Sequence, residues 1–234
     1  MCLLLALARD VATSELWIAA NRDERLDRPW QPPRLLVADP PVFGGRDLTG
    51  GGSWLAVNLR SGFVAAVTNA RRGAPPHERS RGSLVVELAA ERTLADAVAL
   101  LSELDLTRYG AFNLLLADTA ARWLASNEPA ARVERAEAPV VAIGNDPLDA
   151  PSERVVLAQA RAERAAGLAG EAMSERLERL LADHGGEDPV CRHGERYGTV
   201  CSAVVTIAGA EVTRYRFAAG PPCVTAFADV PLPE

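Results

Sequence analysis

The sequence predicts an α+β fold in which antiparallel sheets are covered by helices, either as a layered arrangement or as a four-layer αββα sandwich. Strand-like segments occur in blocks, and pairs of amphipathic helices separate these blocks. Single strands do not alternate with single helices, as they would in a doubly wound parallel sheet. No linker, repeat or low-complexity stretch divides the 234 residues, so we predict one domain over residues 1–234.

The first half of the chain begins with strands and continues with helices. Four segments have the apolar or alternating character of strands: residues 3–8, 16–20, 54–59 and 63–68. Two helices are predicted next, over residues 81–92 and 93–104, because apolar residues recur there at three- and four-residue spacing. Ser80 is the expected cap of the first of these helices.

The second half repeats this order. Strands are predicted over residues 111–118, 121–126 and 140–145. Two amphipathic helices follow, over residues 151–166 and 174–185. The chain then returns to strands over residues 200–207 and 212–218. This second block of strands and helices is what favours two helix-covered sheets over a single one.

Composition and charge exclude several classes of function. The net charge is −6 with both signs interspersed, so the chain lacks the basic stripe that nucleic acids require. All 25 basic residues are arginine, which excludes lysine Schiff bases and phosphate-binding-loop lysines. The apolar start is too short for a signal peptide, and no run approaches the roughly 20 residues of a membrane span. These features predict a cytoplasmic protein without a membrane span.

Cys2 is the first candidate for chemistry, because removal of the initiator methionine makes it the amino-terminal residue. A free α-amino group has a pKa of about 7.7–8.0, so it can accept a proton from the thiol of its own residue. The alternative is a small apolar residue that enters the first strand. Met1-Cys2 therefore supports a catalytic role only together with other residues of a site.

Four polar residues, Asn21-Arg22-Asp23-Glu24, follow the apolar segment 16–20. That segment can pair antiparallel with residues 3–8, which would bring the tetrad close to the amino terminus. A carboxylate there could hold the terminal ammonium, and a guanidinium would favour the thiolate. The alternative is a turn in which the Asn and Asp side chains bond to their own backbone.

Residues 44–54 form a glycine-rich segment without the lysine or the strand-to-helix context of a phosphate-binding loop. We interpret it as a tight turn whose glycines, Gly52 among them, allow close approach to a pocket. Trp54 begins the next strand and is interpreted as a core residue rather than a stacking platform. Arg81 lies at the start of helix 81–92, where its guanidinium could also face a substrate carboxylate.

Two histidines and two cysteines near the carboxyl end raise the question of a zinc site: His184, Cys191, His193 and Cys201. They form neither a Cys-x-x-Cys pair nor a helical pair of histidines. We therefore predict no metal and interpret residues 184–198 as an exposed loop that can overhang the site.

Short motifs occur in one order along the chain: Met1-Cys2, Asn21-Arg22-Asp23-Glu24, Arg28-Pro29, Gly50 to Asn58, Thr68-Asn69, Ser80-Arg81-Gly82, Phe112-Asn113-Leu114, Gly144-Asn145 and Tyr197-Gly198-Thr199. In this order they resemble the NRDE family, also called transport and Golgi organisation protein 2. The resemblance covers essentially the whole chain. Its most specific part is the tetrad followed by the Gly-Gly-Gly-Ser-Trp-Leu segment.

The resemblance implies a distant relationship to the amino-terminal nucleophile (Ntn) hydrolases, which share an αββα sandwich. Its nearest chemical relatives would be penicillin V acylases and bile salt hydrolases, which cleave amides with an amino-terminal cysteine. By position, the resemblance implies these catalytic roles: Cys2 as nucleophile, Asp23 as the carboxylate contacting the α-amine, Arg22 as the guanidinium beside the thiol, Asn69 as an oxyanion or positioning side chain, and Asn145 as the donor that polarises the scissile carbonyl.

One position departs from the pattern of those hydrolases. They have an arginine directly after the Tyr-Gly-Thr segment, where this chain has Val200. Arg46 and Arg196 are the candidates to replace it, and the sequence does not choose between them. The predicted substrate-binding residues are Arg46, Gly52, Trp54 and Arg81.

Two classes of function stay open. The first is a cysteine amidohydrolase that acts on a linear amide of a small molecule and needs no cofactor, which the joint presence of Cys2, Asp23, Asn69 and Asn145 favours. The second is a non-catalytic carrier or trafficking protein, which Val200 favours. Eukaryotic relatives in the family are linked to Golgi organisation and haem handling, so haem or lipid would then be the cargo. The sequence predicts neither the substrate nor the oligomeric state.

Overall fold

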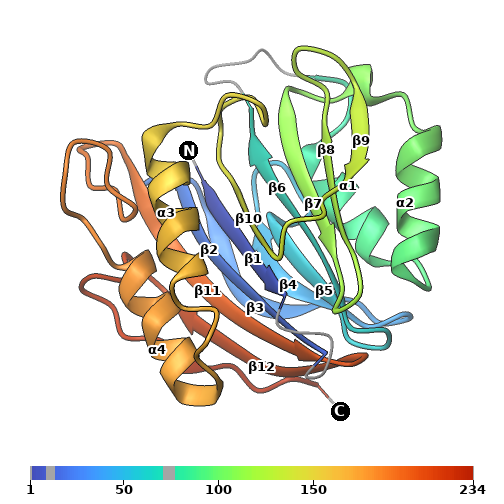
Figure 1. Ribbon diagram of the computed structural model, residues 1–234. Coiled ribbons are helices and arrows are strands. Elements are labelled where there is room, and N and C mark those ends of the chain that lie inside the picture. Colours follow the sequence, from blue (N-terminus) through green and yellow to red (C-terminus); the bar gives the residue numbers. More distant parts are fainter. Residues whose placement is uncertain (1, 9–13, 71–76, 234) are drawn as a thin grey trace.

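The computed structural model describes residues 2–8, 14–70 and 77–233, which form two antiparallel sheets with helices on their outer faces (Figure 1). The first sheet has the strand order β10 (Val140–Ile143), β1 (Leu3–Ala8), β2 (Glu15–Arg25), β11 (Tyr197–Ala208), β12 (Glu211–Ala218) and β13 (Ala228–Asp229). The second has the order β3 (Trp30–Val37), β4 (Val42–Asp47), β5 (Leu55–Asn58), β6 (Phe63–Asn69), β7 (Phe112–Ala117), β8 (Arg122–Ser126) and β9 (Arg132–Arg135).

The helices form the two outer layers. Helices α3 (Glu153–Glu163) and α4 (Gly170–Leu181) cover the first sheet, whereas α1 (Arg81–Ala89) and α2 (Leu94–Glu103) cover the second (Figure 1). One apolar core lies between the two sheets, and a separate core lies under each helix pair. The predicted four-layer αββα sandwich is therefore confirmed, with every sheet pairing antiparallel.

Strand β1 shows why the amino-terminal run is continuously apolar. Successive side chains of a strand point to opposite faces. Leu4 therefore packs into the core between the sheets, whereas Leu3 and Leu5 pack under α3 and α4. Because both faces of this sheet are covered, the strand carries apolar residues without alternation.

The polar tetrad lies inside a strand, which excludes the alternative of a turn after the strand. Strand β2 continues to Arg25, and Asn21 pairs with Leu3 on one side and with Ser202 on the other. The Asn21 amide donates to the carbonyls of Leu181 at 2.9 Å and Val190 at 3.0 Å. These contacts replace solvent for the buried polar side chain and connect β2 to the end of α4.

Strands β3, β4, β9 and β13 were not predicted. For β3 and β4 the reason lies in their residues. Strand β3 contains two prolines and lies at a sheet edge, where missing backbone donors are tolerated. Strand β4 contains Gly44, where an added Cβ would lie 2.3 Å from the Leu55 carbonyl oxygen.

Trp54 precedes β5 rather than beginning it. The expected cap is confirmed, since the Ser80 hydroxyl accepts from the Gly82 amide at 3.2 Å.

Within the described part of the chain, no helix combines the length and the apolar character needed to cross a bilayer.

Candidate active site

A pocket of about 480 Å³ opens where β1 begins, and it brings together segments from both sheets and from the start of α1. Its lining residues are Cys2, Arg22, Asp23, Glu24, Arg28, Asp47, Thr49, Gly50, Gly51, Ser53, Trp54, Val67, Asn69, His77, Arg79, Ser80, Arg81, Gly82 and Gly110. Six of the predicted site residues are thus in one place. Among the described residues that line this pocket, Arg46, Gly52 and Asn145 are not included.

The thiol of Cys2 is partly buried at the start of β1. It donates to the backbone carbonyl of Asp23 on the neighbouring strand, with a sulfur-to-oxygen distance of 3.8 Å. Burial raises the pKa of this thiol above its ordinary value, and the positive charge of Arg22 only partly opposes the rise. Cys2 is therefore a protonated thiol at neutral pH, and nucleophilic attack requires a base.

Arg22 faces the space between the sheets, where two groups hold it. Its Nη2 lies 2.7 Å from Oδ2 of Asp47, and its guanidinium carbon lies 4.4 Å from the centre of the Trp54 ring. Its Nη1 is buried without a hydrogen-bond partner in the described part of the chain. Trp54 is thus a wall of the pocket that stacks on a cation. The stacking and the ion pair with Asp47 hold Arg22 in place at the pocket wall.

Asp47 organises the loop that follows β4. Besides Arg22, it binds Arg28 through two hydrogen bonds of 2.7 and 3.1 Å and accepts from the amides of Thr49 and Gly50 at 3.0 and 2.7 Å. Burial favours the neutral acid, but these donors outweigh it and hold the pKa of Asp47 below its ordinary value. The carboxylate therefore stays charged at neutral pH and shapes the loop at the pocket rim.

The Asp23 side chain contacts the opposite face of the same sheet. Its Oδ2 accepts from Nη1 of Arg154 on α3 at 2.9 Å, and its Oδ1 accepts from the Thr199 hydroxyl at 2.7 Å. Nε of Arg192 lies 3.9 Å from Oδ2. Burial raises the pKa of Asp23, while Arg154 and Thr199 oppose the rise. Neighbouring residues of a strand alternate, which is why Arg22 reaches the second sheet and Asp23 reaches α3.

The two predicted asparagines are close together, but only one lines the pocket. Asn69 ends β6 with its side chain exposed at the pocket. Asn145 is buried after β10, and its Nδ2 donates to the backbone carbonyl of Asn69. Asn113 donates to the Gly144 carbonyl at 3.0 Å and thereby holds the segment that carries Asn145. Asn145 is therefore placed to position the end of β6 rather than to contact a ligand.

Gly52 lies behind the pocket wall rather than in it. Its φ is +75°, that of the adjacent Gly51 is +68°, and a Cβ on Gly52 would lie 2.1 Å from the carbonyl carbon of Gly82. The Ser53 amide also donates to the Gly82 carbonyl at 3.0 Å. The predicted turn is found only after Asp47, because residues 44–47 belong to β4, and its glycines let the loop contact the backbone at the start of α1.

Arg81 lines the pocket together with Arg22, Arg28 and Arg79, whereas Arg46 and Arg196 do not. Both Arg46 and Arg196 are exposed and do not line the pocket in the described part of the chain. Nη1 of Arg81 donates to the Ala111 carbonyl at 2.9 Å. Burial lowers the pKa of Arg81, with a further contribution from the charge of Arg28. Val200, where an arginine was expected, packs in the core between the sheets.

Four residues of the site were missed by the sequence analysis: Arg28, Asp47, Arg154 and Thr199. Arg28 and Thr199 belong to motifs that carried the family resemblance, so a signal existed without an assigned role. Asp47 follows two glycines and an arginine in a segment interpreted only as a turn. Arg154 had no signal, because a charged residue on an amphipathic helix is usually exposed.

Solved structures with the same arrangement provide an independent comparison. The Caenorhabditis elegans N-acylethanolamine-hydrolyzing acid amidase (NAAA) ortholog superposes with a TM-score of 0.60 at 12% sequence identity. The alignment covers 87% of this chain and 92% of that one. Eukaryotic HslV from Trypanosoma brucei matches with a TM-score of 0.41 at 13% identity, over 77% of this chain and 90% of that one. At these identities, the similarity to the amidase ortholog supports the Ntn-hydrolase-like fold alone.

A search of curated proteins found no match. The sequence of residues 1–216, however, matches the family described as Transport and Golgi organisation 2. This match spans the pocket, all four α-helices, the second sheet and the first sheet apart from β13 and the end of β12. The chain therefore belongs to the Transport and Golgi organisation 2 family.

Proposed function

We propose that this protein is an amino-terminal-cysteine amidohydrolase that cleaves the C–N bond of a small amide. The observation that carries the proposal is the position of Cys2, whose thiol lies at the start of β1 in a pocket with Arg22 and Asn69. The fold supports the proposal, because the amidase ortholog that shares it is described as hydrolysing N-acylethanolamines, which are amides.

The base in this proposal is the α-amine that removal of Met1 would free on Cys2. The amine takes the thiol proton as sulfur attacks the amide carbonyl carbon, and a tetrahedral intermediate forms. It then delivers that proton to the leaving nitrogen as the C–N bond breaks, which leaves a thioester on Cys2. Water, deprotonated by the same amine, breaks the thioester, releases the acid and restores the thiol.

The oxyanion of this reaction needs a donor at the pocket, and Asn69 is the proposed one. Its side chain is exposed to the pocket at the end of β6. Asn145 acts through it as a positioning residue, by donating to the Asn69 backbone carbonyl. One such donor typically lowers the barrier by about 2.7–4 kcal/mol.

Arg81 favours an amide that carries a carboxylate. It makes no ion pair with a carboxylate of the described residues, whereas Arg22, Arg28 and Arg79 each have one. A guanidinium that is partly desolvated and unpaired attracts an anionic group of a ligand. The proposed substrate class is therefore an N-acyl amino acid or a similar anionic amide.

Replacement of Arg81 by glutamine is expected to lower kcat/KM for N-acylglycines by about 10- to 100-fold, the effect of losing one charge-assisted hydrogen bond. Hydrolysis of the matching neutral N-acylglycinamides should stay unchanged. Arg81→Lys is the control, because it keeps the charge. Equal losses for the anionic and the neutral series would show that Arg81 does not bind a carboxylate.

The proposal is tested most directly by the intact mass of protein purified with its unmodified amino-terminal sequence. We expect loss of the initiator methionine and a single iodoacetamide adduct on Cys2 that disappears in Cys2→Ala. Complete retention of Met1 would overturn the mechanism, because the nitrogen of Cys2 would then be a peptide nitrogen without basicity. Peptide mapping separates this adduct from one on Cys223, which is also partly exposed.

The apolar residue at position 200 favours one other function, a non-catalytic carrier. Val200 is buried in the core between the sheets. The position where the related hydrolases have an arginine therefore has an apolar side chain here. The same pocket offers Cys2 and His77, residue types that ligate haem iron, beside arginines suited to carboxylates. Haemin titration followed by absorbance tests this function: a saturable spectral change, together with no hydrolysis of any amide, would favour the carrier.

A further inference from the structure

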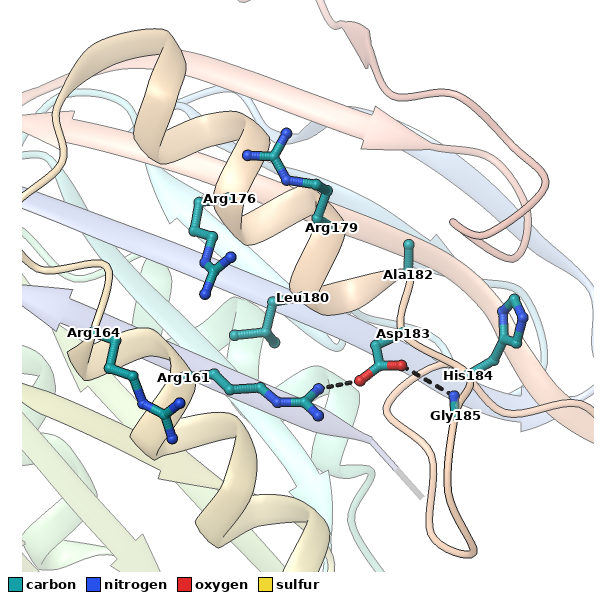
Figure 2. Close-up of a pocket in the computed structure, with 9 residues that line it drawn as sticks. All are labelled: Arg161, Arg164, Arg176, Arg179, Leu180, Ala182, Asp183, His184 and Gly185. Carbon is teal, nitrogen blue, oxygen red and sulfur yellow. Dashed lines mark hydrogen bonds and ion pairs between the residues drawn. The ribbon is translucent and has the colours of Figure 1, made fainter.

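Four potential metal ligands converge beyond the end of α4, three from the loop between α4 and β11 and one from the turn after β12. His184 follows α4, Cys191 and His193 lie in the segment before β11, and Cys223 lies in the turn after β12. Figure 2 shows how the chain leaves α4: Asp183 is held between Arg161 and the Gly185 amide, and His184 points away from the arginines. The cluster is separate from the pocket that contains Cys2.

Two of the three distances within this cluster equal those between the ligands of one zinc ion, and the third is slightly shorter. Nε2 of His193 lies 3.1 Å from Sγ of Cys223, and Sγ of Cys191 lies 3.6 Å from Sγ of Cys223. Cys191 Sγ and His193 Nε2 are 3.7 Å apart. Tetrahedral bonds of normal zinc–sulfur and zinc–nitrogen length separate the ligand atoms by about 3.3–3.8 Å.

The fourth ligand is His184, which lies on the exposed side of the cluster. Ligand atoms of His184, His193 and Cys223 all lie within 4.8 Å of one another. The two imidazole rings meet edge to face, with their centres 5.7 Å apart. Cys191, which is buried, lies outside this group, so the exposed His184 side chain must move toward it to complete the tetrahedron.

We propose that His184, Cys191, His193 and Cys223 bind one Zn²⁺ ion in a closed Cys₂His₂ site. Two thiolates and two imidazoles in a tetrahedron are the set that zinc takes in structural sites. On binding, the thiols of Cys191 and Cys223 each release one proton to solvent, and the histidines bind as neutral imidazoles. The two thiolate charges then balance the charge of the ion.

A disulfide between Cys191 and Cys223 is the competing interpretation, because their sulfurs are close enough to bond after a small shift. A disulfide would not explain why the imidazoles of His184 and His193 both lie close to the sulfur of Cys223. It also requires an oxidant, whereas zinc binding requires only loss of protons. The histidines therefore favour the metal, and disulfide formation is one of the outcomes that the test below separates.

The expected role of the ion is to fix the segment that lies behind Asp23. Arg192 stands between two of the ligands in the sequence, and its Nε lies 3.9 Å from the Asp23 carboxylate. The backbone amide of Cys191 donates to the Asp183 carbonyl at 2.8 Å, so the start of this segment is already held in place. Zinc would add a crosslink to the turn that carries Cys223, which is distant in sequence.

The test is metal binding by the reduced, full-length protein after treatment with a chelator. We expect one equivalent of Zn²⁺ by competition with a chromogenic chelator, and an intense Co²⁺ spectrum typical of tetrahedral thiolate coordination. His184→Ala and Cys223→Ser should each weaken zinc binding on the order of 100-fold or more. Cys201→Ser is the matched control, because its thiol lies in the core between the sheets, and it should bind zinc like the unmodified chain.

Two results would overturn the zinc site. One is zinc binding that is unchanged in both His184→Ala and Cys223→Ser. The other is absence of stoichiometric binding in protein whose thiols are free by titration with a disulfide reagent; a Cys191–Cys223 disulfide found by peptide mapping would then identify the pair as a redox site. Because the readout is metal stoichiometry, this test is independent of whether the protein hydrolyses amides.

Discussion

Replacement of Cys2 by alanine is expected to abolish amide hydrolysis and to leave the fold intact. Removal of a catalytic nucleophile typically lowers kcat by a factor on the order of 10⁴ to 10⁶. The stability should change little, because the thiol makes one long hydrogen bond of 3.8 Å and is only partly buried. The measurement is release of free acid from a panel of N-acyl amides, followed by mass spectrometry, alongside a thermal unfolding curve.

The matched control is Cys201→Ala, which makes the same chemical change in the core between the sheets. It removes a fully buried thiol, so it should lower the melting temperature more than Cys2→Ala and the turnover far less. Turnover by Cys2→Ala at the rate of the unmodified chain would rule out this cysteine as the nucleophile. A loss of both folding and activity in Cys2→Ala alone would show a structural rather than a chemical role.

Breaking the ion pair between Asp23 and Arg154 is expected to have the largest effect on stability. Both side chains are almost fully buried, and their charged atoms lie 2.9 Å apart. Removal of one partner leaves an uncompensated charge in the interior, which costs about 3–5 kcal/mol in the free energy of unfolding. We expect this loss in Asp23→Ala and a somewhat smaller one in Arg154→Met, since Asp23 there retains Thr199 and Arg192.

A double-mutant cycle measured by urea unfolding separates the pair from its surroundings. The variant with both replacements should be more stable than the sum of the two single losses predicts, because neither charge is then left alone. Asp27→Ala is the control: its ion pair with Arg25 is shorter, at 2.6 Å, but both side chains are about two-thirds exposed. That replacement should change the free energy of unfolding far less than either replacement in the buried pair, because exposed ion pairs contribute little to stability. Strict additivity in the Asp23–Arg154 cycle would contradict the coupling.

The layers of the fold followed from the sequence because they depend on patterns that extend over many residues. Strand β1 and the helices α1 to α4 could be predicted from apolar spacing alone. Strands β3 and β4 could not, because their prolines and glycines are tolerated only at an edge or against a close backbone neighbour. Those conditions come from the partner strand, which the local sequence does not contain.

The candidate site was predictable where chemistry is local and not where it depends on distant partners. Cys2 and Asn69 were recognised from short motifs, and the pocket contains both. The tetrad was recognised as important, but the alternation that directs Arg22 and Asp23 to opposite faces required knowing that β2 continues through it. Arg154 is far from Asp23 in the sequence and contacts it only in the folded chain, so no sequence motif could predict this ion pair.

The same limit applied to the cluster beyond α4. Zinc-site spacing rules describe ligands that a single hairpin or helix brings together. Here His184 and Cys191 come from the loop between α4 and β11 and Cys223 comes from the turn after β12, while Cys201, which was considered in the sequence, lies in the core between the sheets. The prediction of no metal rested on spacing, whereas the zinc site proposed above rests on the convergence of these residues in the fold.

The backbone contact between Gly52 and Gly82 limits how the pocket can change during evolution. Neither position can gain a side chain while this backbone stays where it is. A Cβ on Gly52 would lie 2.1 Å from the carbonyl carbon of Gly82, and a Cβ on Gly82 would lie 2.6 Å from the carbonyl oxygen of Gly51, the neighbour of Gly52. The two positions should therefore covary: a relative with a larger residue at one of them must have rebuilt the loop or the first turn of the helix. Such paired changes would single out relatives whose pockets accept differently shaped ligands.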